Sequence, residues 1–218
     1  MLIIEKVNYT YKTQAGPVHA LKDVSATFEN GKFYAITGRS GSGKTTLVSL
    51  IAGLDIPDDG EIRLDEINLK DIDKNRFRRE KMGIIFQTYH LLPQFTAAEN
   101  IEMVLDLNKI SKNEKKEKID NLLKAVGLTE FHGKKRPLQL SGGEQQRVAI
   151  ARSIAANPDI IIGDEPTGNL DNENGRNIIK ILKSLAHDKN KCVIVVTHAD
   201  EVSDEADVVY KMIDGKLS

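Results

Sequence analysis

The sequence is poor in cysteine, in tryptophan and in long apolar stretches. Its single cysteine, Cys192, excludes an internal disulfide and a cysteine-based zinc cage, and fits a reducing compartment. The longest apolar stretches, 47–54, 160–162 and 192–196, are far shorter than the ~20 residues of a membrane-spanning helix. The segment 1–6 lacks the basic-then-apolar layout of a secretion signal. We therefore expect a cytoplasmic protein that reaches a membrane only through a partner.

The sequence also has no excess of either basic or acidic residues. The 31 basic and 32 acidic residues give a formal net charge of −1, so no global field favours nucleic acid or an anionic lipid surface. With 40% hydrophobic and 29% charged residues, the composition is that of an ordinary globular protein. The length of 218 residues allows one large domain or two small ones.

Short strand-like runs alternate with helical patterns along most of the chain. The runs 160–162 and 193–196 lack alternation between apolar and polar residues, as expected of parallel strands covered on both faces. Asn30-Gly31 predicts a tight turn, and Asp58-Asp59-Gly60 a second one. The pattern predicts an α/β core with an antiparallel β flank. A helix is expected over 45–54, and strands over 2–9, 19–29, 32–37, 61–64, 82–86, 159–163, 191–197 and 208–213.

The middle of the chain differs, because little strand signal occurs between residues 90 and 157. Helices are expected over 97–107, 113–126 and 141–156. The lysine-rich run 109–120 mixes charges of both signs, which is typical of a solvated helix face rather than a binding patch. We expect residues 1–218 to form a single domain. Its α/β core would comprise 1–88 and 157–218, and a helical subdomain of about 89–156 would be inserted into that core.

A glycine-rich segment, Gly38-Arg39-Ser40-Gly41-Ser42-Gly43-Lys44-Thr45, matches the phosphate-binding pattern G-x-x-x-x-G-K-[ST] between a predicted strand and a predicted helix. Glycines let backbone N–H groups approach phosphates, and the following helix adds the positive end of its dipole. The lysine would contact the β- and γ-phosphates and the threonine hydroxyl would ligate Mg²⁺. The sequence thus predicts a nucleoside triphosphate site built from Gly38, Ser40, Gly41, Ser42, Gly43, Lys44, Thr45 and Thr46.

Two acidic residues end the apolar run 160–162, in the order Gly163-Asp164-Glu165. Adjacent side chains on a strand point to opposite faces, so the two carboxylates cannot act as one clamp. We assign Asp164 to Mg²⁺, together with Thr45, and Glu165 to the attacking water as general base.

A second glycine-containing helix start lies at Leu140-Ser141-Gly142-Gly143-Glu144. Ser141 and Glu144 form an S-x-x-E capping box. Two glycines in the first turn lower helix propensity by ~1 kcal/mol each, and they suit a helix N-terminus that an anion approaches closely. We infer that Ser141, Gly142 and Gly143 complete the triphosphate site of another copy in a head-to-tail dimer.

Taken together, these segments resemble the ATP-binding subunit of an ABC transporter over essentially the whole chain. The resemblance implies the ABC ATPase fold: a P-loop NTPase core with a mixed sheet, an antiparallel β flank and an inserted helical subdomain. It also assigns roles to further positions. Gln87 matches the glutamine that contacts Mg²⁺ and water and senses the membrane subunit, and His198 matches the histidine that contacts the γ-phosphate and orients Glu165. Asp171, in Asn169-Leu170-Asp171, would lie at the dimer seam or simply cap a helix. Tyr11 matches the aromatic residue that stacks on adenine, with Tyr9 as the neighbouring alternative.

Within the family, the similarity is to the group serving lipoprotein release, macrolide or peptide efflux, and cell division. It rests on the segments 87–93, 96–101 and 164–171. Glu144, Gly163 and His90 depart from the group's usual Gln, Ala and Asn, but no functional group is lost. The resemblance implies a homodimer that sandwiches two ATP·Mg²⁺ and drives separately encoded permease subunits at the inner face of the cell membrane. Export or extraction of lipoprotein, antimicrobial peptide or drug is expected.

Alternative functions predict different features in the sequence. An ABC ATPase could drive mechanical signalling across the membrane instead of transport, with the same chain and a different membrane partner. ABC proteins acting on DNA or ribosomes usually carry a long coiled coil or two ATPase modules, and this sequence has neither, so no nucleic-acid partner is expected. A nucleotide kinase or GTPase would not explain segment 140–144, and no guanine-reading N-K-x-D occurs. A non-catalytic binding module would be expected to lack Glu165 or Lys44, and both are present.

Overall fold

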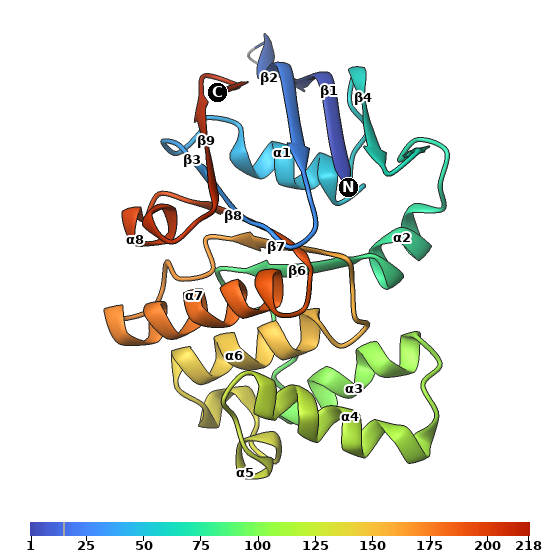
Figure 1. The fold of residues 1–218 in the computed structure, drawn as a ribbon, viewed down its shortest axis with the longest axis vertical. Coiled ribbons are helices and arrows are strands. Elements are labelled where there is room, and N and C mark those ends of the chain that lie inside the picture. The colour runs from blue at the N-terminus through green and yellow to red at the C-terminus, as the bar shows by residue number, and fades with distance from the viewer. Residues whose placement is uncertain (15) are drawn as a thin grey trace.

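The computed structural model describes residues 1–14 and 16–218 and contains two β-sheets. A six-stranded sheet has the order β10-β9-β3-β8-β7-β6, in which β10 is antiparallel to β9 and the other neighbours are parallel. A four-stranded antiparallel sheet has the order β2-β1-β4-β5 (Figure 1). The predicted α/β class with a mixed sheet and an antiparallel flank is confirmed. The strands are β1 (Leu2–Thr13), β2 (Gly16–Phe28), β3 (Phe33–Thr37), β4 (Asp59–Leu64), β5 (Ile67–Asn68), β6 (Met82–Phe86), β7 (Ile160–Asp164), β8 (Cys192–Thr197), β9 (Val208–Ile213) and β10 (Lys216–Leu217).

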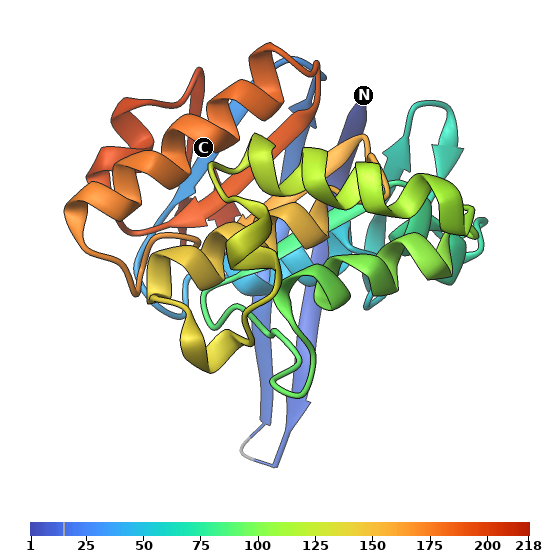
Figure 2. The ribbon, with the colours of Figure 1, turned by 90° about the horizontal axis from the view of Figure 1, so that it is seen from below.

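Helices cover both faces of the six-stranded sheet. Helix α1 lies between this sheet and the antiparallel sheet, while α6 and α7 lie on the opposite face with α3, α4 and α5 beyond them (Figures 1 and 2). The helices are α1 (Lys44–Ile51), α2 (Lys74–Glu80), α3 (Ala97–Leu107), α4 (Lys112–Ala125), α5 (Glu130–Gly133), the 3₁₀ turn η1 (Pro137–Gln139), α6 (Gly142–Ser153), α7 (Asn172–His187) and α8 (Asp200–Asp204).

The central strands are buried on both faces, as their unbroken apolar runs predict. Ile160 and Ile162 pack into the core beneath α1 and the antiparallel sheet, whereas Ile161 packs into a second core with α6 and α7. In β8, Ile194 and Val193 divide between the same two cores. Because both faces of these central strands are apolar, the strands are fixed between the two cores.

The segment between β6 and β7 carries only helices among its described residues, α3 to α6 with η1. Its N-terminal helix, α3, is capped by Thr96, whose side chain forms a reciprocal capping box with Glu99. Helix α6 packs against the sheet through Val148 and Ile150, so it joins the helical segment to the core.

Some boundaries differ from those predicted. Strands β2 and β3 do not pair, because the turn at Asn30-Gly31 passes the chain from one sheet to the other. The turn predicted at 58–60 is also wrong in part, because Asp59 and Gly60 already belong to β4. Gly60 has φ 80° opposite a register shift in β1, where a side chain would collide with the Lys6 carbonyl. The elements β5, β10, α2, α5, η1, α7 and α8 are not among those predicted.

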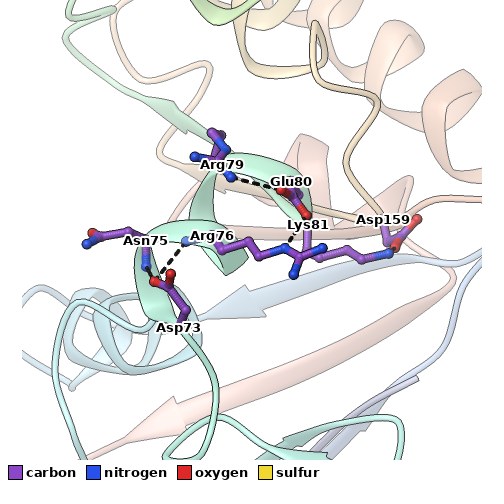
Figure 3. Close-up of polar contacts among 7 residues, drawn as sticks. All are labelled: Asp73, Asn75, Arg76, Arg79, Glu80, Lys81 and Asp159. Carbon is purple, nitrogen blue, oxygen red and sulfur yellow. Dashed lines mark hydrogen bonds and ion pairs between the residues drawn. The ribbon is translucent and has the colours of Figure 1, made fainter. Parts of the chain in front are cut away.

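Polar contacts fix helix α2 at its start and just beyond its end (Figure 3). The Asp73 carboxylate caps its start by accepting hydrogen bonds from the backbone N–H groups of Asn75 and Arg76. Just beyond its end, Lys81 Nζ lies 2.8 Å from Asp159 Oδ2, which joins α2 to the start of β7. These contacts hold α2 at the edge of the six-stranded sheet. No helix in the described part of the chain is long and apolar enough to span a membrane.

The strand order places the predicted motifs side by side. Strands β3, β8, β7 and β6 are consecutive neighbours and run parallel, so their carboxyl ends meet at one edge. The phosphate-binding segment follows β3, His198 follows β8, Glu165 follows β7 and Gln87 follows β6. Ligands of open α/β sheets bind at this edge.

Candidate nucleotide-binding site

A cavity of about 1080 Å³ lies at the carboxyl edge of the sheet. It is bounded by the phosphate-binding loop on one side and by the ends of β6, β7 and β8 on the other. Of the predicted site residues, Tyr11, Ser40, Gly41, Gly43, Lys44, Thr45, Thr46, Gln87, Asp164, Glu165 and His198 line it. Gly38 and Ser42 lie in the same loop but do not line the cavity, and Ser42 is buried.

The phosphate-binding loop has the backbone geometry that its glycines predict. Gly43, at φ 110°, immediately precedes α1, and a β-carbon there would lie 2.5 Å from the Ala20 carbonyl oxygen. Lys44 is buried, and its Nζ donates to the carbonyl oxygens of Gly38 at 2.7 Å and Arg39 at 3.1 Å. The ammonium is therefore held over the loop, where phosphate oxygens would replace the two carbonyls.

Thr45 and Asp164 both line the cavity, and each carries an oxygen that can ligate a metal ion. Neither side chain forms a hydrogen bond with the described residues 1–14 and 16–218. Burial, with the neighbouring charge of Glu165, raises the pKa of Asp164 above its usual value, while Lys44 opposes this. A hydroxyl and a carboxylate without protein partners fit a divalent cation such as Mg²⁺, whose charge would favour the ionised form of Asp164.

Glu165 and His198 are in contact. Glu165 follows β7 with φ 49°, and its side chain is 16% exposed, against 70% for His198. Nδ1 of His198 lies 2.8 Å from Oε1 of Glu165, and Oγ1 of Thr197 donates to Oε2 at 3.1 Å. The predicted partnership of Glu165 and His198 is thus present in the geometry, and Thr197 adds a contact that the sequence analysis does not include.

Tyr11 and Tyr9 have different surroundings. Tyr11 lines the cavity and is 41% exposed, with its hydroxyl 3.3 Å from Thr46 Oγ1. Tyr9 packs edge-on against the Tyr11 ring and donates its hydroxyl to Asp55 at 2.9 Å. Burial, together with the Asp55 hydrogen bond, raises the pKa of Tyr9 to about 12. The geometry favours Tyr11 as the ring that meets a nucleobase.

Gln87 lines the cavity, and its side chain is engaged by the loop after β7. Its Nε2 donates to Asn169 Oδ1 at 3.3 Å, and Asn169 Nδ2 donates to the Gln87 carbonyl at 3.1 Å. A role for Gln87 in contacting Mg²⁺ would require its side chain to exchange Asn169 for the cation.

The predicted second half-site lies outside the cavity. Ser141 caps α6, and the capping box with Glu144 is present in both directions. None of Ser141, Gly142 and Gly143 lines the cavity. A β-carbon on Gly143 would collide with the side chain of Asn174, so this glycine is also required by packing within the chain.

Asp171 caps α7, in agreement with the simpler of its two predicted roles. Its Oδ1 accepts from the Asn174 backbone N–H at 2.8 Å, and its Oδ2 accepts from Asn174 Nδ2 at 2.9 Å. The Asn174 hydrogen bonds hold the pKa of Asp171 below its usual value. Asp171 does not line the cavity, and a role at a dimer seam stays a prediction.

Several cavity residues were not predicted. The turn between β9 and β10 supplies Asp214 and Gly215, and β2 supplies Val18, His19 and Lys22. The Gly215 N–H donates to the Ser42 carbonyl at 2.9 Å, and its own carbonyl accepts from the Lys22 N–H at 2.8 Å. The C-terminal turn thus joins the phosphate-binding loop to the antiparallel sheet. An Asp-Gly turn signal marks it in the sequence, but nothing there indicates what it packs against.

Comparisons with known proteins agree with this geometry. The profile of the ABC transporter family, described as "ABC transporter", matches residues 21–168. An uncharacterized ABC transporter ATP-binding protein of Methanocaldococcus jannaschii, MJ0796, is 40% identical over 100% of this chain and 95% of its own length. The lipoprotein-releasing system ATP-binding protein LolD of Francisella tularensis is 38% identical, covering 100% and 95%. The solved dimer of MJ0796 in a post-hydrolysis state with ADP and Pi superposes with a TM-score of 0.91 at 39% identity, covering 100% of this chain and 97% of that chain.

Proposed function

Because this chain belongs to the ABC transporter family, we propose that its ATPase activity powers a separate membrane permease through ATP-dependent closure of a dimer. The chain is an ATP-binding subunit and an ATPase.

Catalysis is assigned to residues at the carboxyl edge of the sheet. Lys44 and the loop N–H groups would bind the phosphates, while Thr45, Asp164 and Gln87 would hold Mg²⁺, which neutralises phosphate charge when bound. Glu165 would accept a proton from the attacking water. His198 would bind the γ-phosphate and orient Glu165, and Tyr11 would stack on adenine.

The observation that carries the dimer proposal is the separation of the two predicted anion-binding helix starts. The cavity includes the loop before α1 but none of Ser141, Gly142 and Gly143 at the start of α6. One nucleotide therefore does not contact both helix starts within one chain as it is folded here. The α6 start of a partner would complete the site, with Asp171 of each chain near the seam.

The test compares the oligomeric state of three variants in MgATP by light scattering. Glu165→Gln, which we expect to bind ATP but hydrolyse it slowly, should form a dimer that ADP does not support. Lys44→Ala should stay monomeric because it no longer binds the phosphates. Ser141→Arg should bind a fluorescent ATP analogue as a monomer and fail to dimerise. A Ser141→Arg, Glu165→Gln double variant that dimerises normally would refute the shared site.

A groove of about 340 Å³ offers a place for the permease. It lies between α2 and α3, with Arg78 and Arg79 on one wall and Val104 and Leu107 on the other. Leu107 is 62% exposed, so apolar surface is available to a short amphipathic helix. Arg152, at the base of the groove, donates to the Tyr89 and His90 carbonyl oxygens in the loop after Gln87. A helix bound here would therefore be linked to the catalytic edge, and the chain would sit at the inner face of the membrane.

Leu107→Arg tests this docking. With its cognate permease, we expect the variant to lose co-purification and permease-dependent stimulation while its basal ATPase stays unchanged. Leu138→Arg, also exposed but outside the groove, is the control. Equal loss in both variants would count against the groove.

The proposed cargo is a lipoprotein, an antimicrobial peptide or a drug that is exported or extracted from the membrane. The 38% identity to a lipoprotein-releasing ATP-binding protein over the full chain supports this class. The second candidate is mechanical signalling, which the resemblance of segments 87–93, 96–101 and 164–171 to the cell-division group allows. ATPase measurements with the permease in proteoliposomes separate them. Stimulation by a cargo of this class supports transport, and stimulation only by a periplasmic binding partner supports signalling.

A further inference from the structure

Thr197 is the only polar residue of β8 and is fully buried. The strand begins Cys192-Val193-Ile194-Val195-Val196, and each of these side chains is buried in one of the two cores. A hydroxyl at the end of such a strand needs partners, since a buried polar group without a hydrogen bond is unfavourable. Its partners therefore indicate what it does.

The direction of the Thr197 hydrogen bonds is fixed by chemistry. The backbone N–H of Ala199 donates to Oγ1 at 3.0 Å. The hydroxyl has a single proton, and the second contact is Oε2 of Glu165 at 3.1 Å. An ionised carboxylate only accepts, so the Thr197 proton points at Glu165.

The two oxygens of Glu165 are held by unequal partners. Oε1 faces the exposed imidazole of His198, and Oε2 faces the buried hydroxyl of Thr197, with the His198 backbone N–H at 3.4 Å. A His198 side chain that turned toward a γ-phosphate would leave Oε1 without this partner, whereas Thr197 would still hold Oε2. Glu165 also has φ 49°, an unfavourable backbone conformation for a non-glycine residue, so its side chain needs support from its surroundings.

We propose that Thr197 is a positioning residue for ATP hydrolysis: its hydroxyl anchors Oε2 of Glu165 and leaves Oε1 as the oxygen that accepts the proton of water. The inference rests on the proposed role of Glu165 as the general base. The Ala199 contact alone would give Thr197 a purely structural role, because it satisfies a backbone N–H at the start of α8. The two roles differ in what they predict for turnover.

Thr197→Val is nearly isosteric and removes the hydroxyl. We expect kcat to fall about tenfold to a hundredfold because the base loses its fixed orientation, while KM for ATP changes less than about threefold. Thr197→Ser keeps the hydroxyl and should recover kcat to within about threefold of the wild type. Thr197→Cys keeps the size with a weak donor and should be intermediate; it serves in place of the valine variant if that variant does not fold.

A matched control lies on the neighbouring strand. Thr37 pairs with Thr197 in register, and its hydroxyl faces the Tyr210 carbonyl at 3.4 Å instead of Glu165. Thr37→Val should leave kcat within about twofold of the wild type. Equal losses in Thr37→Val and Thr197→Val would indicate a general effect of removing a hydroxyl from the end of a central strand and would overturn the proposal.

A double-mutant cycle shows whether Thr197 acts through Glu165. In single-turnover experiments on Glu165→Gln, adding Thr197→Val should slow hydrolysis less than about threefold further. Full additivity, a wild-type kcat in Thr197→Val, or a serine variant as slow as the valine one would each overturn the inference. If Glu165→Gln itself turns over normally, the proposed function fails with it. A slow Glu165→Gln beside a normal Thr197→Val defeats only the role of Thr197.

Discussion

Nδ1 of His198 lies 2.8 Å from Oε1 of Glu165, across the ends of two neighbouring parallel strands. Since an ionised carboxylate only accepts, the imidazole donates this hydrogen bond. We predict that His198→Ala lowers kcat about a hundredfold or more and leaves the ATP-dependent dimer of Glu165→Gln intact. His187→Ala is the control, because His187 faces Asp207 at the same distance on the surface. It should keep kcat within about twofold, and wild-type turnover in His198→Ala would contradict the assignment.

The adenine site can be tested at two tyrosines. Loss of a stacking ring weakens binding by about 1–3 kcal/mol. We therefore expect Tyr11→Ala to raise the Kd for ATP about tenfold to a hundredfold, measured by fluorescence titration. Tyr9→Phe removes only the hydroxyl bonded to Asp55, so its Kd should change less than about threefold. An unchanged Kd in Tyr11→Ala would contradict the assignment of the nucleobase to Tyr11.

The parts of the site that the sequence predicts are those whose residues lie close together in the chain at fixed intervals. The loop 38–45 could be found because a phosphate cradle needs its glycines and lysine at fixed intervals, and the apolar runs before Glu165 and His198 reveal central parallel strands. Thr197 and Asp214 could not be found in this way. Their importance depends on which loops pack together at the end of the sheet, and no local pattern encodes that.

The same limit explains the errors in the fold. Gly60 reads as a turn residue, yet it lies in β4, because its positive φ serves a register shift against β1 far away in the chain. Asn30-Gly31 reads as a hairpin turn, but the strands on either side join different sheets. Gly143 suits the approach of an anion, and the structure adds an intrachain reason, namely the side chain of Asn174.

The capping box of α6 should make stability depend on pH. The Ser141 backbone N–H, which donates to Glu144 Oε2 at 2.7 Å, holds the pKa of Glu144 below its usual value. The charged form therefore stabilises the fold above the unfolded-state pKa, and this stabilisation is lost as the pH falls through the folded-state pKa.

We predict that Glu144→Gln is about 0.5–1 kcal/mol less stable than the wild type at pH 7. The difference should shrink as the pH falls below about 4.3, the usual pKa of Glu, and through the lower folded-state pKa of Glu144. Urea denaturation at several pH values measures it. Glu117→Gln, on the exposed face of α4, should show no such trend. A difference that persists unchanged at pH 3 would mean that the charge of Glu144 contributes nothing.

Two requirements could explain the glycine at position 143: packing against Asn174 within the chain, and the close approach of the partner's ATP. A double variant separates them. A β-carbon there would displace Asn174, whose side chain bonds Asp171 and Arg147. Gly143→Ala should therefore destabilise the fold by about 1–3 kcal/mol, although alanine favours a helix. Adding Asn174→Ala removes the collision, so we expect the double variant to lose at least about 1 kcal/mol less than the sum of the single variants.

ATP-dependent dimerisation should not recover with the stability. If the phosphates of the partner's ATP approach the α6 backbone closely, the methyl group of Ala at position 143 obstructs them whatever residue 174 is. In the Glu165→Gln background we therefore predict at least about a tenfold weaker dimer for the Gly143→Ala, Asn174→Ala protein than for Asn174→Ala alone, measured by sedimentation in MgATP. Recovery of both stability and dimerisation would mean that only Asn174 requires the glycine. The start of α6 would then lose its assignment as the second half of the nucleotide site.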